Sequence, residues 1–373
     1  MKYSKYKIKD IILNNNKFYN FLISIIYIMK NLTLNDYKRN GHNCFDREKN
    51  NKQNFVIDSH FHMRPFGGSP IELKKMINIL NKNGILFVNV EGIGQRLPTN
   101  SPCTNYKKCP GVKVRPSITN DIINAQLVLD NNLHKTGVNG VKVILSMTFP
   151  DLSKPDEVVN GIHFLDKEYP GLFRWMGEVD VVKQALFNNG HKPVSKNTIS
   201  NWGPFMKILK KRNIPLAIHL DLGDNTDNFK YLSLLKYILN LYPNNKIILS
   251  HLGISKELTN IDTEKHASVL DNLLNTYKNI YLDISWSILY DNIFRYKKGR
   301  QFYIDLMNKH STRFLTGTDF VSSVNKSEKI YIKALKINSI ILKYLDDYAY
   351  QRISLGQNYL DLIGSKYKAP KIC

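Results

Sequence analysis

The segment FVIDSHFH, residues 55–62, is an apolar run that ends in two histidines. It is the first of eight such runs, each rich in Val, Ile, Leu and Phe, a composition typical of strands buried on both faces of a parallel sheet. The other runs are GILFVNVEGIG (84–94), GVKVILSMTF (140–149), LFRWMGEVDV (172–181), IPLAIHLDLG (214–223), KIILSHLG (246–253), NIYLDISW (279–286) and RFLTGTDF (313–320).

Helical patterns separate these runs. Apolar residues at three- and four-residue spacing predict helices over 69–83, 119–135, 153–169, 195–212, 227–242, 262–277 and 299–310, and two more over 326–346 and 347–363. The first has a start signal, with Ser69 as N-cap, Pro70 at the first helical position and Glu72 completing a capping box.

This alternation predicts an α/β fold, a (β/α)8 TIM barrel over residues 55–373 with extra C-terminal helices and an N-terminal extension over 1–54. A chain of 373 residues accommodates one barrel of about 250 residues plus insertions. An open doubly wound sheet is the alternative fold. It would normally show a Gly-rich phosphate turn after an early strand, and the sequence has none.

Metal-competent side chains stand at the ends of these predicted strands. The carboxyl ends of barrel strands meet at one face, where active sites lie. His60 and His62 alternate along the first strand, so both imidazoles point to the same side. The predicted metal ligands are His60, His62, Glu178, His219, His251 and Asp319.

Imidazole and carboxylate together suit one or two divalent metal ions, zinc first, with manganese or iron as substitutes. Metal binding lowers the pKa of water to about 7. Asp319 is placed to take the proton of that water, and His251 or His219 to polarise the substrate instead of binding metal. For Glu178 the alternative is a salt bridge to Lys142 or Arg174.

Arg64 follows the histidine pair by two residues and is expected to face the mouth of the site. A guanidinium there would bind a carboxylate or phosphate of a small-molecule substrate. The alternative for Arg64 is a surface charge. Trp175, Trp286 and Phe149 form either an aromatic wall or part of the core.

The pattern of HxH on strand one, an acidic residue on strand four, histidines on strands five and six and Asp on strand eight resembles the amidohydrolase superfamily. The segments VIDSHFHMRPFGG, IPLAIHLDLG, KIILSHLG, LTGTDF and LGQNYLDLIG resemble its amidohydrolase-2 branch, which includes aminocarboxymuconate semialdehyde decarboxylase, over about residues 55–364. The resemblance implies a metal-dependent hydrolase of an amide, ester or lactone of an acidic substrate. It leaves open a non-hydrolytic decarboxylase.

Glu178 departs from this pattern, since many two-metal members carry a carboxylated lysine on strand four and several amidohydrolase-2 members have no ligand there. A glutamate in Gly-Glu followed by an apolar residue is closer to the TatD-like nucleases, so a metal-dependent nuclease is a third hypothesis. A non-catalytic barrel that binds through its basic surface is a fourth.

The net charge of +22 would attract nucleic acid or anionic lipid, but the lysines are scattered. No specific nucleic-acid partner is therefore expected, and a homo-oligomer stays open. In the N-terminal extension, residues 19–29 form an apolar run preceded by lysines, which is too short to span a bilayer but suits an export or membrane-targeting segment. An amphipathic helix packed on the barrel is the alternative for this run, and the protein would otherwise be cytoplasmic.

Four cysteines are present, none in a C-x-x-C pair, which argues against a zinc knuckle or a thioredoxin-type site. Cys103 and Cys109 flank a short loop. They either form a local disulfide, if the protein is exported, or remain unpaired.

Overall fold

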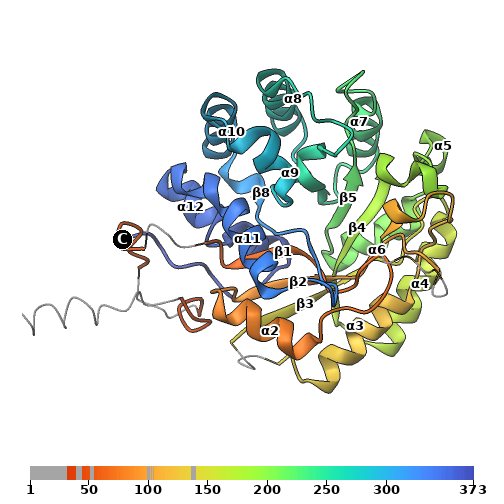
Figure 1. The fold of residues 1–373 in the computed structure, drawn as a ribbon, viewed down its shortest axis with the longest axis horizontal. Helices are drawn as coiled ribbons and strands as arrows, with labels where there is room; N and C mark the ends of the chain where they lie inside the picture. The colour runs from red at the N-terminus through yellow and green to blue at the C-terminus, as the bar shows by residue number, and fades with distance from the viewer. Residues whose placement is uncertain are drawn as a thin grey trace, which may run out of the picture.

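The computed structural model describes residues 32–38, 44–50, 54–98, 101, 103, 105–135 and 140–373. It confirms the predicted barrel, with all strand pairs parallel and the strands in the order β8-β7-β6-β5-β4-β3-β2-β1-β9. Helices surround this sheet on the outside (Figure 1). The strands are β1 (Ile57–His62), β2 (Phe87–Glu91), β3 (Lys142–Met147), β4 (Phe173–Val182), β5 (Leu216–Leu220), β6 (Ile247–Leu249), β7 (Ile280–Asp283), β8 (Phe314–Leu315) and β9 (Phe320–Val321).

The predicted eighth strand is divided into two short strands, β8 and β9, which close the barrel. β8 pairs with β7, and β9 pairs with β1. Between the two short strands, the amide of Ser59 donates to the Thr316 carbonyl (3.0 Å) and the amide of Asp319 donates to the His60 carbonyl (2.9 Å). Gly317 permits this close approach, because a Cβ there would lie 2.7 Å from the Cβ of His60.

The predicted helical stretches are helical, although two of them split. The helices are α2 (Leu73–Lys82), α3 (Thr119–Asp130), α4 (Pro155–Glu168), α5 (Lys196–Ser200), α6 (Gly203–Arg212), α7 (Leu232–Leu241), α8 (Thr263–Thr276), α9 (Ser287–Leu289), α10 (Lys297–Lys309), α11 (Glu328–Ser339), α12 (Asp347–Ile353) and α13 (Gln357–Leu362). Stretch 195–212 becomes α5 and α6, and stretch 347–363 becomes α12 and α13.

The predicted start of the first helix at Ser69 is wrong. Helix α2 begins after Glu72, which makes no side-chain capping hydrogen bond. The preceding residues pair with the loop after β9 instead: the Ser69 carbonyl accepts from the amide of Val324 (3.0 Å), and the amide of Ile71 donates to Ser322 Oγ (3.3 Å). This tertiary pairing replaces the local cap.

Two described segments of the predicted extension lie against the body of the protein. Tyr37 is fully buried and donates its hydroxyl to the Leu355 carbonyl (2.8 Å). Cys44 forms a disulfide with Cys373, beside a backbone bridge between Phe45 and Ile372. This long-range pairing was not predicted, whereas the local disulfide between Cys103 and Cys109 is present.

The apolar run 19–29, on which the targeting prediction rests, lies outside the described residues. Among the helices that the structure describes, none combines the length and the apolar character needed to cross a bilayer.

Candidate metal centre

The six predicted ligands converge at the carboxyl-terminal face of the barrel. His60 and His62 end β1, Glu178 lies in β4, His219 in β5, His251 in the turn after β6, and Asp319 immediately before β9. All are buried except Asp319, whose side chain is 15% exposed. All but His60 line a cavity of about 560 Å³.

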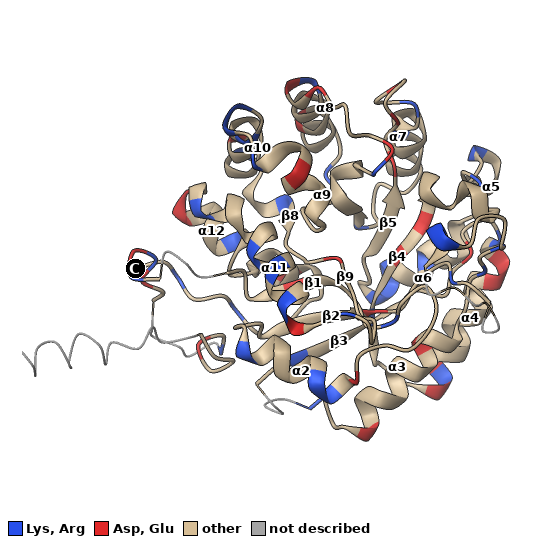
Figure 2. Ribbon diagram, in the orientation of Figure 1, with Lys and Arg blue, Asp and Glu red and all other residues tan. Residues whose placement is uncertain are grey.

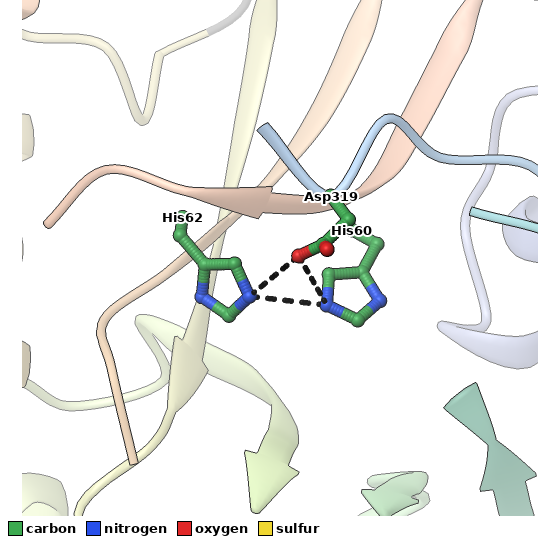
Figure 3. A group of neighbouring side chains, drawn as sticks. All are labelled: His60, His62 and Asp319. Carbon is green, nitrogen blue, oxygen red and sulfur yellow. Dashed lines mark hydrogen bonds and ion pairs between the residues drawn. The ribbon is translucent and has the colours of Figure 1, made fainter. Parts of the chain in front are cut away.

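Figure 3 shows the first cluster, in which His60, His62 and Asp319 point toward one another. The two Nε2 atoms lie 3.1 Å apart, and Asp319 Oδ1 lies 3.3 Å from Nε2 of His62 and 3.6 Å from Nε2 of His60. Ligands on a tetrahedral zinc ion with bonds of 2.0–2.1 Å are about 3.3 Å apart. The triangle therefore has the size of one face of a metal coordination sphere.

A second cluster forms around Glu178. Its Oε1 lies 2.7 Å from Nδ1 of His219 and 3.0 Å from Nε2 of His251. The same carboxylate also reaches the first cluster, with Oε1 3.8 Å from Nε2 of His60 and Oε2 4.0 Å from Nε2 of His62. Glu178 thus stands between two groups of nitrogen and oxygen ligands.

Each of the four histidines is anchored through its outward ring nitrogen. Nδ1 of His60 faces Asp283 Oδ2 (2.7 Å) and Nδ1 of His62 faces the Gly92 carbonyl (2.6 Å). Nε2 of His219 faces Asp221 Oδ1 (3.0 Å), and Nδ1 of His251 faces Ser285 Oγ (3.0 Å). In the neutral ring the anchored nitrogen carries the proton, so the inward nitrogen presents a lone pair, as in metal sites.

The pKa shifts of the buried histidines and carboxylates are those of a site that binds positive charge. Burial would lower the pKa of His219, but the Glu178 carboxylate raises it to about 10. Burial would raise the pKa of Asp319, but its hydrogen bond with His62 and the nearby histidines lower it to about 2. The pKa of Glu178 is held well below its usual range, against burial, by His219 and Lys183. The ionised form of these carboxylates is stabilised by neighbouring positive charge. Divalent cations bound at the same place would stabilise it in the same way.

No protein-family model matches the chain, and no curated protein matches it in sequence. Solved structures do match. An amidohydrolase from Burkholderia multivorans with bound zinc aligns over 83% of this chain and 99% of its own, at 10% identity and a TM-score of 0.54. A protein of Agrobacterium tumefaciens in apo form aligns over 83% and 94%, at 13% identity and a TM-score of 0.54.

The chain has the barrel fold of an amidohydrolase. A manganese-bound 5-carboxyvanillate decarboxylase from Novosphingobium aromaticivorans aligns more loosely, over 89% and 99% of the chains at 12% identity and a TM-score of 0.46. At these identities the likeness concerns the fold.

Two buried carboxylates of this site were missed in the sequence. Asp283, at the end of β7, anchors His60, and its Oδ2 accepts the hydroxyl of Ser285 (2.5 Å). Glu91, at the end of β2, lies 3.7 Å from Nε2 of His60 and accepts the amide of Glu178 (3.0 Å). Burial raises the pKa of Glu91 to about 7. The signal was available, because both residues end apolar runs just as the predicted ligands do.

The ionic partner of Glu178 is Lys183, not Lys142 or Arg174. Lys183 Nζ lies 3.1 Å from Glu178 Oε2 and 3.3 Å from Asp180 Oδ1. Lys142 donates instead to the His134 carbonyl (2.6 Å), and Arg174 donates to the Ile363 carbonyl. The metal-bridge and salt-bridge interpretations of Glu178 are therefore compatible in space, since its two oxygens have different neighbours.

Arg64 does not line the cavity. Its Nε donates to Asn124 Oδ1 on α3 (3.2 Å), and burial and the charge of Arg96 lower its pKa. The prediction that Arg64 binds the substrate has no support from this position. Of the three aromatic candidates only Trp286 lines the cavity, while Trp175 packs in the core against Tyr359 (5.4 Å between rings).

The backbone conformation at two of the ligands positions their side chains. His251 and Asp319 both have a positive φ, of 54° and 51°, which is uncommon for residues other than glycine and concentrates at functional sites. Buried Asp58 holds the segment before Asp319 by accepting from the amide (2.8 Å) and hydroxyl (2.7 Å) of Thr318.

His266 on α8 contacts the turn that contains His251. Its burial makes the stability of the folded protein depend on pH. The ring is fully buried, faces Tyr303 Oη (2.7 Å) with Nδ1 and donates from Nε2 to the Leu252 carbonyl (3.1 Å). Burial lowers its pKa from 6.5 to about 4. As the pH falls from 6.5 to 4 the unfolded chain binds a proton that the folded protein does not, so the free energy of unfolding should fall by about 3 kcal/mol.

Urea unfolding at pH 7.5, 6, 5 and 4, in the presence of chelator, measures this effect. Wild type should exceed His266→Gln in stability at pH 7.5, and the difference should shrink toward pH 4. Parallel pH profiles for the two proteins would show that His266 does not titrate in this range.

Proposed function

We propose that this chain is a metal-dependent hydrolase that cleaves an amide, ester or lactone bond of a small acidic substrate, with two divalent ions, most simply zinc, and manganese or iron as substitutes. One ion would bind to His60, His62 and Asp319, and the other to His219 and His251. Glu178 would be shared between them.

One observation carries this proposal: Glu178 lies within 4.0 Å of inward nitrogens of all four histidines. A single carboxylate between two ligand groups is the arrangement that a pair of ions about 3.5–4 Å apart requires. The anchoring of every outward ring nitrogen supports it further, because such contacts orient histidine ligands and fix their tautomer.

Bound divalent ions would supply a water nucleophile at neutral pH and polarise the scissile carbonyl. Asp319 lies at the cavity wall, and its Oδ1 contacts His60 and His62, so its other oxygen is placed to accept a proton and return it to the leaving group. His251 lies between Glu178 and Trp286 (5.0 Å between rings) and is the candidate to polarise the substrate if it does not bind metal.

Decarboxylation of an acidic substrate remains the alternative reaction for the same pocket, because Lys183, Lys256 and Lys326 line the cavity and suit an acid whichever bond is broken. Product analysis separates the two: hydrolysis incorporates one oxygen from ¹⁸O-labelled water, whereas decarboxylation releases CO₂ without this incorporation into the organic product. A nuclease activity would appear instead as cleavage of single- or double-stranded DNA.

Metal content per chain tests the metal centre. We expect about two divalent ions in protein purified without chelator, and about one in the His60→Asn/His62→Asn variant, because two of the ligands of one ion are removed. Elemental analysis measures both proteins, with His163→Asn as the control for loss of a histidine outside the centre.

Binding of about one ion per wild-type chain would contradict the bridging role of Glu178. Absence of transition metal from folded wild type, even after zinc or manganese is supplied, would overturn the proposed function.

A further inference from the structure

Lysines from four separate βα loops surround the mouth of the cavity. Lys107 and Lys108 lie in the short helix Tyr106–Lys108 after β2, Lys183 directly follows β4, Lys256 follows the turn after β6, and Lys326 precedes α11. Basic residues are also spread over the helices around the barrel (Figure 2). The lysines at the cavity differ from these because they line one cavity.

Four of these five lysines lack a partner of opposite charge within the part of the chain that the structure describes. Lys183 is neutralised by Glu178 and Asp180. Among the ion pairs of the described residues none involves Lys107, Lys108, Lys256 or Lys326. Among the described residues, the only carboxylates that line the cavity are Glu178 and Asp319, and both face the histidines.

The unpaired lysines are also close to one another and to apolar rings. Lys256 Nζ lies 5.7 Å from the centre of the Trp286 ring, and Lys326 Nζ lies 4.9 Å from the centre of the Phe320 ring. Burial and the charge of Lys107 lower the pKa of Lys256, and burial lowers the pKa of Lys326. Binding of an anion would reduce the repulsion between like charges in such a partly apolar setting.

Several contacts hold the described part of the segment that carries Lys107, whose own side chain is exposed. The disulfide between Cys103 and Cys109 closes it, and Asn105 Oδ1 accepts the amide of Lys107 (2.9 Å). The ring of Tyr106 packs edge-on against Phe66 (4.6 Å between centres). Lys107 is therefore held near the cavity by a loop that is itself anchored.

We propose that Lys107, Lys256 and Lys326 form an anion-binding subsite at the mouth of the cavity, which binds a carboxylate or phosphate of the substrate remote from the bond that is cleaved. Lysine ammonium groups bind both anions as point charges. The subsite takes the role that the sequence had suggested for Arg64. That its ligand is a substrate rests on the proposed function, and a cavity of about 560 Å³ suits a small dianion rather than a polymer.

Calorimetric titration with inorganic phosphate and with succinate, at low ionic strength, tests the subsite. The proteins are wild type, Lys256→Gln/Lys326→Gln, and Lys298→Gln, whose lysine is exposed on α10 and does not line the cavity. We expect at least one of the two anions to bind wild type, and its Kd to rise tenfold or more in the double variant, because two charge-assisted contacts are removed. Lys298→Gln should match wild type.

Anions also bind metal ions, so the titrations are repeated in the His60→Asn/His62→Asn background after the remaining metal has been removed with chelator. The lysine dependence should persist there. Tighter binding of phosphate would identify a phosphorylated substrate, and tighter binding of succinate a dicarboxylate. Absence of binding by either probe, or equal affinity in the double variant and the control, would overturn the subsite while leaving the metal content of the protein untouched. Loss of the metal centre alone would leave this lysine-dependent binding in place.

Discussion

Replacing Asp319 with asparagine is expected to lower kcat/KM by about 10²–10⁴-fold, the usual contribution of a positioned acid or base. Asparagine keeps an oxygen that can face His60 and His62, but it cannot accept a proton. The low pKa of the Asp319 carboxyl, about 2, keeps this group ionised in wild type throughout the neutral range. Hydrolysis of a panel of lactones, esters and amides of dicarboxylic acids provides the measurement.

Asp291→Asn is the matched control, because Asp291 is exposed and lies outside the cavity. Metal content is measured beside activity, so that a loss of proton transfer is distinguished from a loss of metal. An Asp319→Asn variant that keeps its metal and its full activity would contradict the role of Asp319 in proton transfer.

The fold was predictable because each strand is buried on both faces and leaves a continuous apolar run in the sequence. The ligands were predictable for a related reason: a polar residue that ends such a run must face either the barrel interior or the site. His60, His62, His219 and His251 all satisfied this rule, and the structure brings them together. The alternation of β1 placed the first two on one side without any tertiary information.

What could not be predicted depends on contacts between distant segments. The start of α2 is set by pairing with the loop after β9, and the partner of Cys44 is Cys373. Arg64 was expected at the mouth of the cavity because it follows His62 by two residues. The chain has left β1 at that point, and the Arg64 side chain hydrogen-bonds to Asn124. The lysines of the anion subsite come from three loops, and no local pattern marks such residues as neighbours.

Replacing Glu178 with glutamine is expected to destabilise the metal-free protein by about 3 kcal/mol, since breaking one partner of a buried ion pair leaves the other charge uncompensated. Lys183 would retain only Asp180, at 3.3 Å. His219 and His251 would lose the carboxylate that lies 2.7 Å and 3.0 Å from their ring nitrogens. The same substitution should also reduce the metal content by about one ion per chain, because glutamine is a poor bridge between two cations.

A double-mutant cycle with Lys183→Met separates the two effects. Removing both charges leaves neither one buried without a partner, so the double variant should lose less stability than the sum of the two single variants. Urea unfolding in chelator measures the ion pair, and elemental analysis of the same proteins measures the bridge. Additive losses, within about 0.5 kcal/mol, would show that Lys183 and Glu178 do not stabilise each other. In that case the carboxylate would serve the metal ions alone, and Lys183 would be free to join the other lysines in binding the substrate's anionic group.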